Sequence, residues 1–303
     1  MMRGALRWLP VSAVLVLGIT GSGCGSSPTE PTPPAPPTPP PPNAAPVVQS
    51  VVASVTTRTE VHTDVTVTAT VTDAETAVDA LGYAWTATVG TITGTGRNVT
   101  WRLPAGTAMT PQDVTITVAV TEPYQTLENG VIVNRQHRVE RSAAPFRVHD
   151  SAAEVQALSL TFLRNFADNS VTPDACVKDF SDSCPGKAQE KQDIEGVRRG
   201  RFITASALSF TSVQFNSDRT QASAAVDCRF ESTVIQKISP SDPYLPGDRV
   251  VADGRCDLGA IYESGVWKLC VSTFDGDEVK VPALASWRPG TGIARALFGY
   301  SDR

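Results

Sequence analysis

The chain has 303 residues, a formal net charge of −5 at pH 7 and an isoelectric point of about 5.3. This acidic balance argues against nucleic acid as a partner, because nucleic-acid-binding domains carry a concentrated basic excess. Once a leader and a spacer are set aside, the remaining length predicts two domains of ordinary size.

Residues 1–23 have the three parts of an export signal. Arg3 and Arg7 lie near the start, an apolar run follows, and the small residues of the GSG sequence at 21–23 come directly before Cys24. The apolar run is too short to span a bilayer permanently. The leader therefore predicts export of the chain.

The GSGC sequence that ends at Cys24 resembles the cleavage site of bacterial lipoprotein signal peptides. The resemblance implies a diacylated thiol and an acylated amine at Cys24, and several acyl chains together hold a protein firmly in a membrane. The residue after Cys24 is not aspartate, which in enteric members of this family favours the outer membrane. Gly21 stands where the family usually has an aliphatic residue. The alternative is an ordinary secretory signal, which would leave the protein periplasmic or secreted.

Residues 24–46 form a proline-rich spacer that begins with the lipidated cysteine. Proline fixes φ and removes backbone donors, so polyproline II is the expected conformation of this spacer. At roughly 3.1 Å per residue the spacer reaches at most about 70 Å. It is predicted to hold the following domains away from the membrane.

Residues 47–148 are rich in valine and threonine. The alternating sequences VTVTATV at 65–71 and VTITVAV at 114–120 predict half-buried strands. Short strands separated by turn signals, without a helical period, are typical of an all-β sandwich of about 100 residues.

This segment resembles a bacterial Ig-like module of the PKD type. The residues that carry the resemblance are DAE at 73–75, the LxYxW pattern at 81–85 and the GTG turn at 94–96. Trp85 is expected to be the core tryptophan of the sandwich. Residues 122–136 interrupt the pattern and are expected to form an elongated hairpin loop.

The second predicted domain covers residues 151–275 and starts with a helix. The SAAE sequence at 151–154 predicts a capping box, and apolar residues then recur at helical spacing. A second, polar helix is predicted over 188–199. The period then changes to two and predicts four strands joined by short turns, at 201–215, 220–236, 249–262 and 266–274.

A helix followed by a long antiparallel four-stranded meander resembles the NTF2-like, or cystatin-like, α+β superfamily. The resemblance implies helices folded onto a curved antiparallel four-stranded sheet whose concave face often holds a pocket, in enzymes and in binding domains alike. Strand parity places Phe230, Leu258 and Tyr262 on that face, so these are the candidate pocket residues. Residues 276–303 are predicted to be a C-terminal tail.

With Cys24 acylated, five cysteines remain, in a compartment that permits disulfides. The strand register places Cys228 and Cys256 on the same face of neighbouring strands, which favours this pair. A second bridge is expected between Cys176 and Cys184, because it would close a short loop. Val271 is expected to point inward with the alternate residues before it, and Cys270 is then a packed or intermolecular thiol.

The second domain lacks the residues that catalysis in this superfamily commonly uses. No histidine follows His149, and Asp227, Asp253 and Asp257 have the outward parity. No zinc spacing, phosphate loop or serine elbow is present. No catalytic residue, metal or cofactor is therefore expected.

The sequence thus predicts a lipid-anchored cell-envelope protein that presents a non-catalytic binding or assembly domain on an Ig-like stalk. Its partners would be the membrane, through the anchor, and an envelope protein or a glycan. The alternative is a small-ligand binder or an enzyme that uses the concave pocket of the NTF2-like domain.

Overall fold

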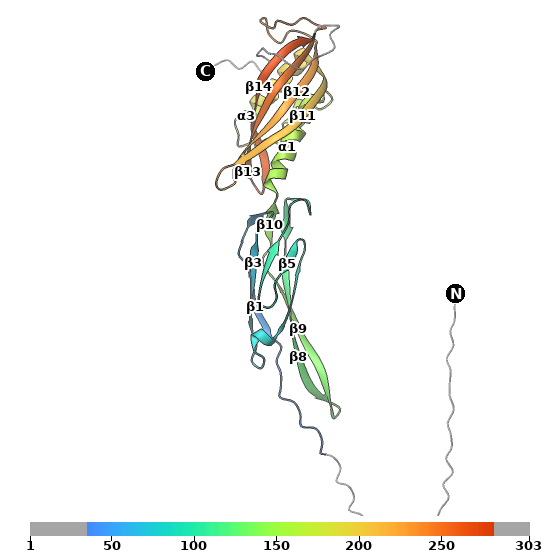
Figure 1. The fold of residues 1–303 in the computed structure, drawn as a ribbon, viewed down its shortest axis with the longest axis vertical. Helices are drawn as coiled ribbons and strands as arrows, with labels where there is room; N and C mark the ends of the chain where they lie inside the picture. Colours follow the sequence, from blue (N-terminus) through green and yellow to red (C-terminus); the bar gives the residue numbers. More distant parts are fainter. Residues whose placement is uncertain (1–34, 282–303) are drawn as a thin grey trace, which may run out of the picture.

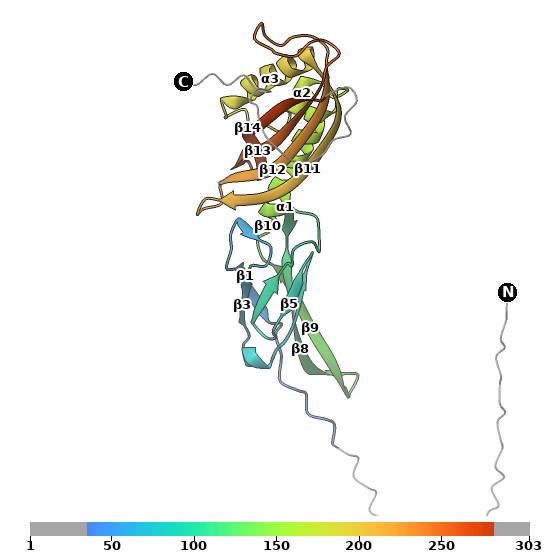
Figure 2. The same ribbon diagram turned by 45° about the horizontal axis from the view of Figure 1, so that its top comes forward.

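The computed structural model describes residues 35–281 (Figure 1). The predicted signal peptide, Cys24 and the first part of the spacer lie outside the described residues, as do residues 282–303 of the predicted tail. Two units are stacked end to end along the long axis of the molecule (Figures 1 and 2). None of the helices between residues 35 and 281 is both long enough and apolar enough to span a bilayer.

The first unit is built from strands in three sheets, with the orders β1-β3-β6-β5, β2-β10-β7 and β4-β8-β9. Its elements, in chain order, are β1 (Val47–Ala53), β2 (Arg58–Glu60), β3 (Val65–Thr72), the 3₁₀ helix η1 (Val78–Ala80), β4 (Gly82–Ala87), β5 (Thr91–Thr93), β6 (Asn98–Arg102), β7 (Gln112–Val114), β8 (Ile116–Glu128), β9 (Val131–Ser142) and β10 (Phe146–His149).

The alternation of valine and threonine decides which face of these strands is buried. In β3 the valines are buried and every threonine is exposed, so the strand has one apolar and one wet face. The three sheets share a single apolar core. Trp101 is fully buried there and contacts the Phe146 ring edge-on at 5.2 Å. Trp85, the expected core tryptophan, packs against the same core but is only half-buried, so Trp101 is the tryptophan at its centre.

Strands β8 and β9 form a hairpin that projects beyond the rest of the first unit, at the end away from the second unit (Figures 1 and 2). They are paired from Thr117 opposite Ser142 to Glu128 opposite Val131. The Asn129-Gly130 turn has two positive φ angles, 52° and 79°, as a two-residue hairpin turn requires. Residues 122–136 therefore form an elongated hairpin, as predicted, but one made of paired strands rather than a loop.

The second unit is α+β, as the sequence predicts. It contains α1 (Ser151–Ala167), α2 (Pro173–Cys176), α3 (Gly186–Gly200) and the antiparallel meander β11 (Arg201–Phe215), β12 (Gln221–Val234), β13 (Arg249–Glu263) and β14 (Val266–Val281). Helices and sheet share one apolar core. Because β14 runs to Val281, the first residues of the predicted tail belong to the sheet.

Helix α1 begins one residue earlier than the predicted capping box. Asp150 is the N-cap: its Oδ1 accepts a hydrogen bond from the Ala153 amide at 3.1 Å. Glu154 completes the box, because its Oε1 accepts from the Asp150 amide at 3.0 Å. The hydroxyl of Ser151 is therefore not needed for capping.

Ser151 instead belongs to a buried joint between the two units, formed by Glu60, His149, Ser151, Tyr262 and Trp267. The Ser151 hydroxyl donates to Glu60 Oε1 at 2.8 Å and accepts from Trp267 Nε1 at 3.0 Å. The ring of His149 is fully buried, and its Nε2 lies 2.9 Å from the Tyr262 hydroxyl. These bonds cross between the units, so the units are packed together rather than joined by a free linker.

A bulge in the β13–β14 pair changes which residues of β14 face the helices. The register shifts between Gly259 and Ala260, and the extra residue on β14 reverses its parity. Val271, predicted to point inward, is therefore 45% exposed. Ser272 and Phe274 face inward in its place.

Gly276 lies opposite a second glycine, Gly254, where β13 and β14 approach closely. A Cβ on Gly276 would lie 2.5 Å from the Asp253 carbonyl oxygen and 2.6 Å from Cζ of Phe274. Only glycine leaves room for this approach. The pair thus allows the Phe274 ring its observed position.

Arg201 ties the connection between β12 and β13 to the sheet. Its guanidinium is 2% exposed and donates to both carboxylate oxygens of Asp242 at 3.0 to 3.1 Å, and to Glu278 Oε1 at 3.1 Å. A buried charge needs such partners. Arg201 follows Arg198 and Arg199 closely in the sequence, but the fold buries its side chain as an internal anchor.

Candidate ligand-binding pocket

A cavity of about 210 Å³ lies in the second unit between the helices and the sheet. Helices α1 and α3 and strands β12, β13 and β14 supply its lining. The lining residues are Phe162, Leu163, Phe166, Glu190, Asp193, Phe230, Cys256, Ser272, Thr273 and Phe274. Mostly apolar lining with a few convergent polar groups is typical of small-molecule sites.

Four phenyl rings form most of the apolar lining of the cavity, beside Leu163 and Cys256. Phe162 and Phe166 are one helical turn apart on α1, which places both rings on the same face of that helix. Phe230 projects from β12, and its ring centroid lies 5.2 Å from that of Phe166 in an edge-to-face contact. The β13–β14 bulge turns Phe274 to this side. A ligand in the cavity would therefore meet aromatic rings from three elements.

Glu190 on α3 is the buried polar group of the cavity, with 8% of its surface exposed. Burial raises the pKa of its carboxyl to about 7; a hydrogen bond from Ser272 opposes this rise, and the negative charge of Asp193 adds to it. The Ser272 hydroxyl donates to Glu190 Oε2 at 2.7 Å. Near neutral pH this carboxyl can therefore either accept or donate a proton.

A disulfide between Cys184 and Cys270 fixes α3 in this position. Their Cα atoms are 5.3 Å apart across 86 residues of sequence. Gly186, the first residue of α3, lies so close to β14 that a Cβ there would be 2.6 Å from the Cys270 carbonyl oxygen. Glu190 follows one turn later and meets Ser272, two residues beyond the bridge.

The predicted bridge between Cys176 and Cys184 was therefore wrong, and so was the prediction of an unpaired Cys270. The backbone of Ser181 donates to the Leu269 carbonyl at 2.8 Å, which brings β14 beside the segment that precedes α3. Cys176 lies in α2 instead, buried against α1, where its thiol donates to the Asn165 carbonyl oxygen at 3.3 Å.

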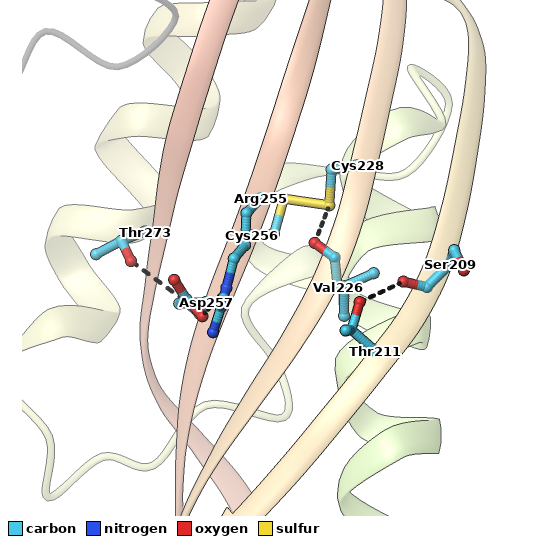
Figure 3. Close-up of a disulfide and its surroundings, with 8 residues drawn as sticks. All are labelled: Ser209, Thr211, Val226, Cys228, Arg255, Cys256, Asp257 and Thr273. Atoms are coloured by element: carbon cyan, nitrogen blue, oxygen red, sulfur yellow. Dashed lines mark hydrogen bonds and ion pairs between the residues drawn. A yellow bond between two sulfur atoms is a disulfide. The ribbon is translucent and has the colours of Figure 1, made fainter.

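The second disulfide joins Cys228 of β12 to Cys256 of β13 (Figure 3), the pair that strand parity favours. Cys256 lies opposite Val226 in the ladder, so the bridge crosses diagonally between the strands. Cys256 also lines the cavity, and the bridge is thus part of the pocket wall. Arg255 and Asp257, the neighbours of Cys256, form an ion pair of 2.8 Å on the other face (Figure 3).

Only one of the three candidate pocket residues, Phe230, lines the cavity. Leu258 is fully buried in the core. Tyr262 lies near the far end of β13, where its hydroxyl contacts His149 in the joint. The concave face of the sheet is thus divided along its length: one end packs against the first unit, and the other end faces the cavity.

Sequence reasoning missed Glu190, although the sequence contains a signal for it. Glu190 lies four residues before Ile194 and seven before Val197, both of which are buried. This spacing places Glu190 on the buried stripe of an otherwise polar helix. Ser272 carried no such signal, because the bulge that turns it inward is not visible in the alternation.

The residues that the structure describes contain no cluster of three histidine, cysteine, aspartate or glutamate side chains that could hold a metal ion.

No protein-family model matches the sequence, and no curated protein matches it. Among solved structures, the chain is similar to a ketosteroid isomerase-like protein from Erwinia carotovora atroseptica, with 13% identity, 42% of this chain and 97% of that chain covered, and a TM-score of 0.34. It is also similar to a hexachlorocyclohexane dehydrochlorinase of type 2, with 8% identity and a TM-score of 0.32. That match covers 45% of this chain and 95% of the dehydrochlorinase. A third similar structure is a Mycobacterium tuberculosis protein of unknown function, with 10% identity and a TM-score of 0.28. That match covers 41% of this chain and 70% of the other. These similarities carry no argument about activity.

Proposed function

We propose that this protein is a lipid-anchored envelope protein with an Ig-like stalk. The stalk carries an NTF2-like domain, and this domain binds a small, largely apolar molecule. The observation that carries the proposal is the cavity of about 210 Å³, with four phenyl rings and one buried carboxyl. A domain that served only as a scaffold would have no need of such a cavity. The pocket thus favours the small-ligand alternative over a purely structural role.

The anchored part of the proposal is supported by the leader and Cys24, and by the two disulfides, which are typical of oxidising compartments. The spacer enters the first unit at the end away from the second unit (Figure 1). With an anchor at Cys24, the pocket would lie in the unit farther along the chain from the membrane. The pocket would then be presented to small molecules outside the bilayer.

Binding is tested with the mature chain and 2-phenylethanol, an aromatic alcohol of suitable size, by titration followed with NMR. We expect saturable binding that shifts resonances of α1, α3 and β14. Ser272→Phe would fill the cavity and abolish binding. Ser209→Phe places the same side chain at an exposed strand position and should leave binding intact. Shifts spread over the surface, or equal binding by both variants, would refute the pocket.

The anchor is tested separately, by labelling whole cells with palmitate. The native chain should incorporate the label, and Cys24→Ala should not. Equal labelling of both chains would rule out lipidation at Cys24 without affecting the pocket.

A further inference from the structure

The charged side chains that line the cavity, in the part of the chain that the structure describes, are all acidic. Glu190 and Asp193, one helical turn apart on α3, both contribute carboxyl groups. Among the described residues that line the cavity there is no lysine, arginine or histidine. When both carboxyls are ionised, the cavity therefore carries negative charge that its own lining does not balance.

The basic side chains closest in sequence to Glu190 are engaged outside the cavity. Lys187 contacts Asp182 and Lys191 contacts Asp174, both at 2.6 Å. Arg198 donates to backbone carbonyls at the end of α1, among them Asn165 at 2.9 Å. Within residues 35–281, the cavity lining therefore has no basic side chain to balance its carboxyls, and a positive charge there would come from the ligand.

The aromatic lining favours a cation as well. The face of a phenyl ring carries partial negative charge, and rings that surround a cavity attract ammonium groups within about 6 Å of their centroids. The rings of Phe162, Phe166, Phe230 and Phe274 meet around the cavity that holds the two carboxyls. A neutral apolar ligand would use the rings but would leave the buried carboxyl without a charged partner.

We propose that the ligand is a small organic amine, positively charged, with one aromatic or branched apolar group. This inference rests on the proposed function and specifies its ligand class. The volume limits the size: a cavity of about 150 Å³ holds benzene, so about 210 Å³ accepts one ring with a short chain. The ammonium would lie between the Glu190 carboxylate and the rings.

The ionisation of Glu190 then controls affinity. With a pKa of about 7, roughly nine-tenths of the carboxyl is ionised at pH 8 and roughly one-tenth at pH 6. If only the ionised form pairs with the amine, apparent affinity scales with that fraction. Among the described residues, the titratable and polar groups that interact with Glu190 are Asp193 on its own helix, the Ser272 hydroxyl on β14, and the Cys176 thiol on α2, whose pKa burial raises.

The test compares 2-phenylethylamine with 2-phenylethanol, two molecules of nearly the same shape that differ in charge. Affinities for the mature chain are measured by isothermal titration at pH 8 and pH 6. At pH 8 we expect the amine to bind at least tenfold more tightly than the alcohol. Between pH 8 and pH 6 amine binding should weaken about tenfold, whereas alcohol binding should change less than twofold.

Glu190→Gln preserves the shape of the side chain and removes its charge. It should weaken amine binding at pH 8 about tenfold, remove the pH dependence, and leave alcohol binding within twofold. Glu195→Gln, an exposed change on the same helix, is the matched control and should alter neither ligand.

Equal affinity for the two molecules at pH 8, or an unchanged amine affinity in Glu190→Gln, would overturn the cationic ligand while leaving the pocket as a site for neutral molecules. Binding of neither molecule would overturn the proposed function together with this inference.

Discussion

Glu190→Gln should also change how stability depends on pH, in the absence of any ligand. The ordinary pKa of a glutamate is 4.5, and in the folded protein burial raises that of Glu190 to about 7. The folded chain therefore holds this proton more tightly than the unfolded chain. The stability that this tighter proton binding contributes is fully present below about pH 4.5 and is lost as the pH rises through about 7.

The size of the effect follows from the two pKa values. At about 1.4 kcal/mol for each pH unit, the difference corresponds to about 3 kcal/mol of unfolding free energy, most of it between pH 5 and pH 8. Glu190 is 8% exposed, so solvent screens it little. Glutamine has no proton to lose in this range, and the variant should keep its stability where the native chain loses it.

The assay is urea unfolding of both chains at pH 5 and pH 8, with Glu195→Gln as the control. Between pH 5 and pH 8, the free energy of unfolding of the native chain and of the control should fall by about 2 to 3 kcal/mol more than that of Glu190→Gln. An identical pH dependence in all three chains would contradict the buried, neutral carboxyl.

Three further changes test the surrounding structure. Arg201→Met leaves two buried carboxylates without their cation and should lower the free energy of urea unfolding by about 3 to 5 kcal/mol. Arg255→Met, on the surface, should lower it by less than about 1 kcal/mol. Equal losses in the two variants would contradict the buried anchor. Tyr262→Phe should lower the free energy of unfolding by about 1 to 3 kcal/mol, because it removes a hydrogen bond of the joint. It should leave 2-phenylethanol binding unchanged. Gly276→Ala should displace the Phe274 ring and weaken that binding, and unchanged binding would exclude a role for the ring.

The elements with a regular apolar period were predictable from sequence. In β3 the alternation of valine and threonine matches the burial residue by residue, because a strand has only two faces. Helix α1 likewise buries Val155, Phe162 and Phe166 at helical spacing. In both elements the spacing of the apolar residues along the sequence matches the single face that is buried.

The parts that sequence missed depend on contacts between distant segments. The Cys184–Cys270 bridge forms because β14 runs beside the segment before α3, and this proximity follows from how the sheet packs, not from the spacing of cysteines. Tyr262 has the inward parity that was predicted, but its end of the sheet packs against the first unit. Parity thus gives the face that a residue occupies, but not what covers that face.

The most direct test of the proposed pocket is a crystal structure of the mature chain soaked with 2-phenylethanol. We expect the ligand between Phe162, Phe230 and Phe274, with its hydroxyl within hydrogen-bonding distance of the Glu190 carboxyl. A filled or collapsed cavity at this position, with the alcohol absent or bound elsewhere on the protein, would contradict a ligand-binding role for this domain.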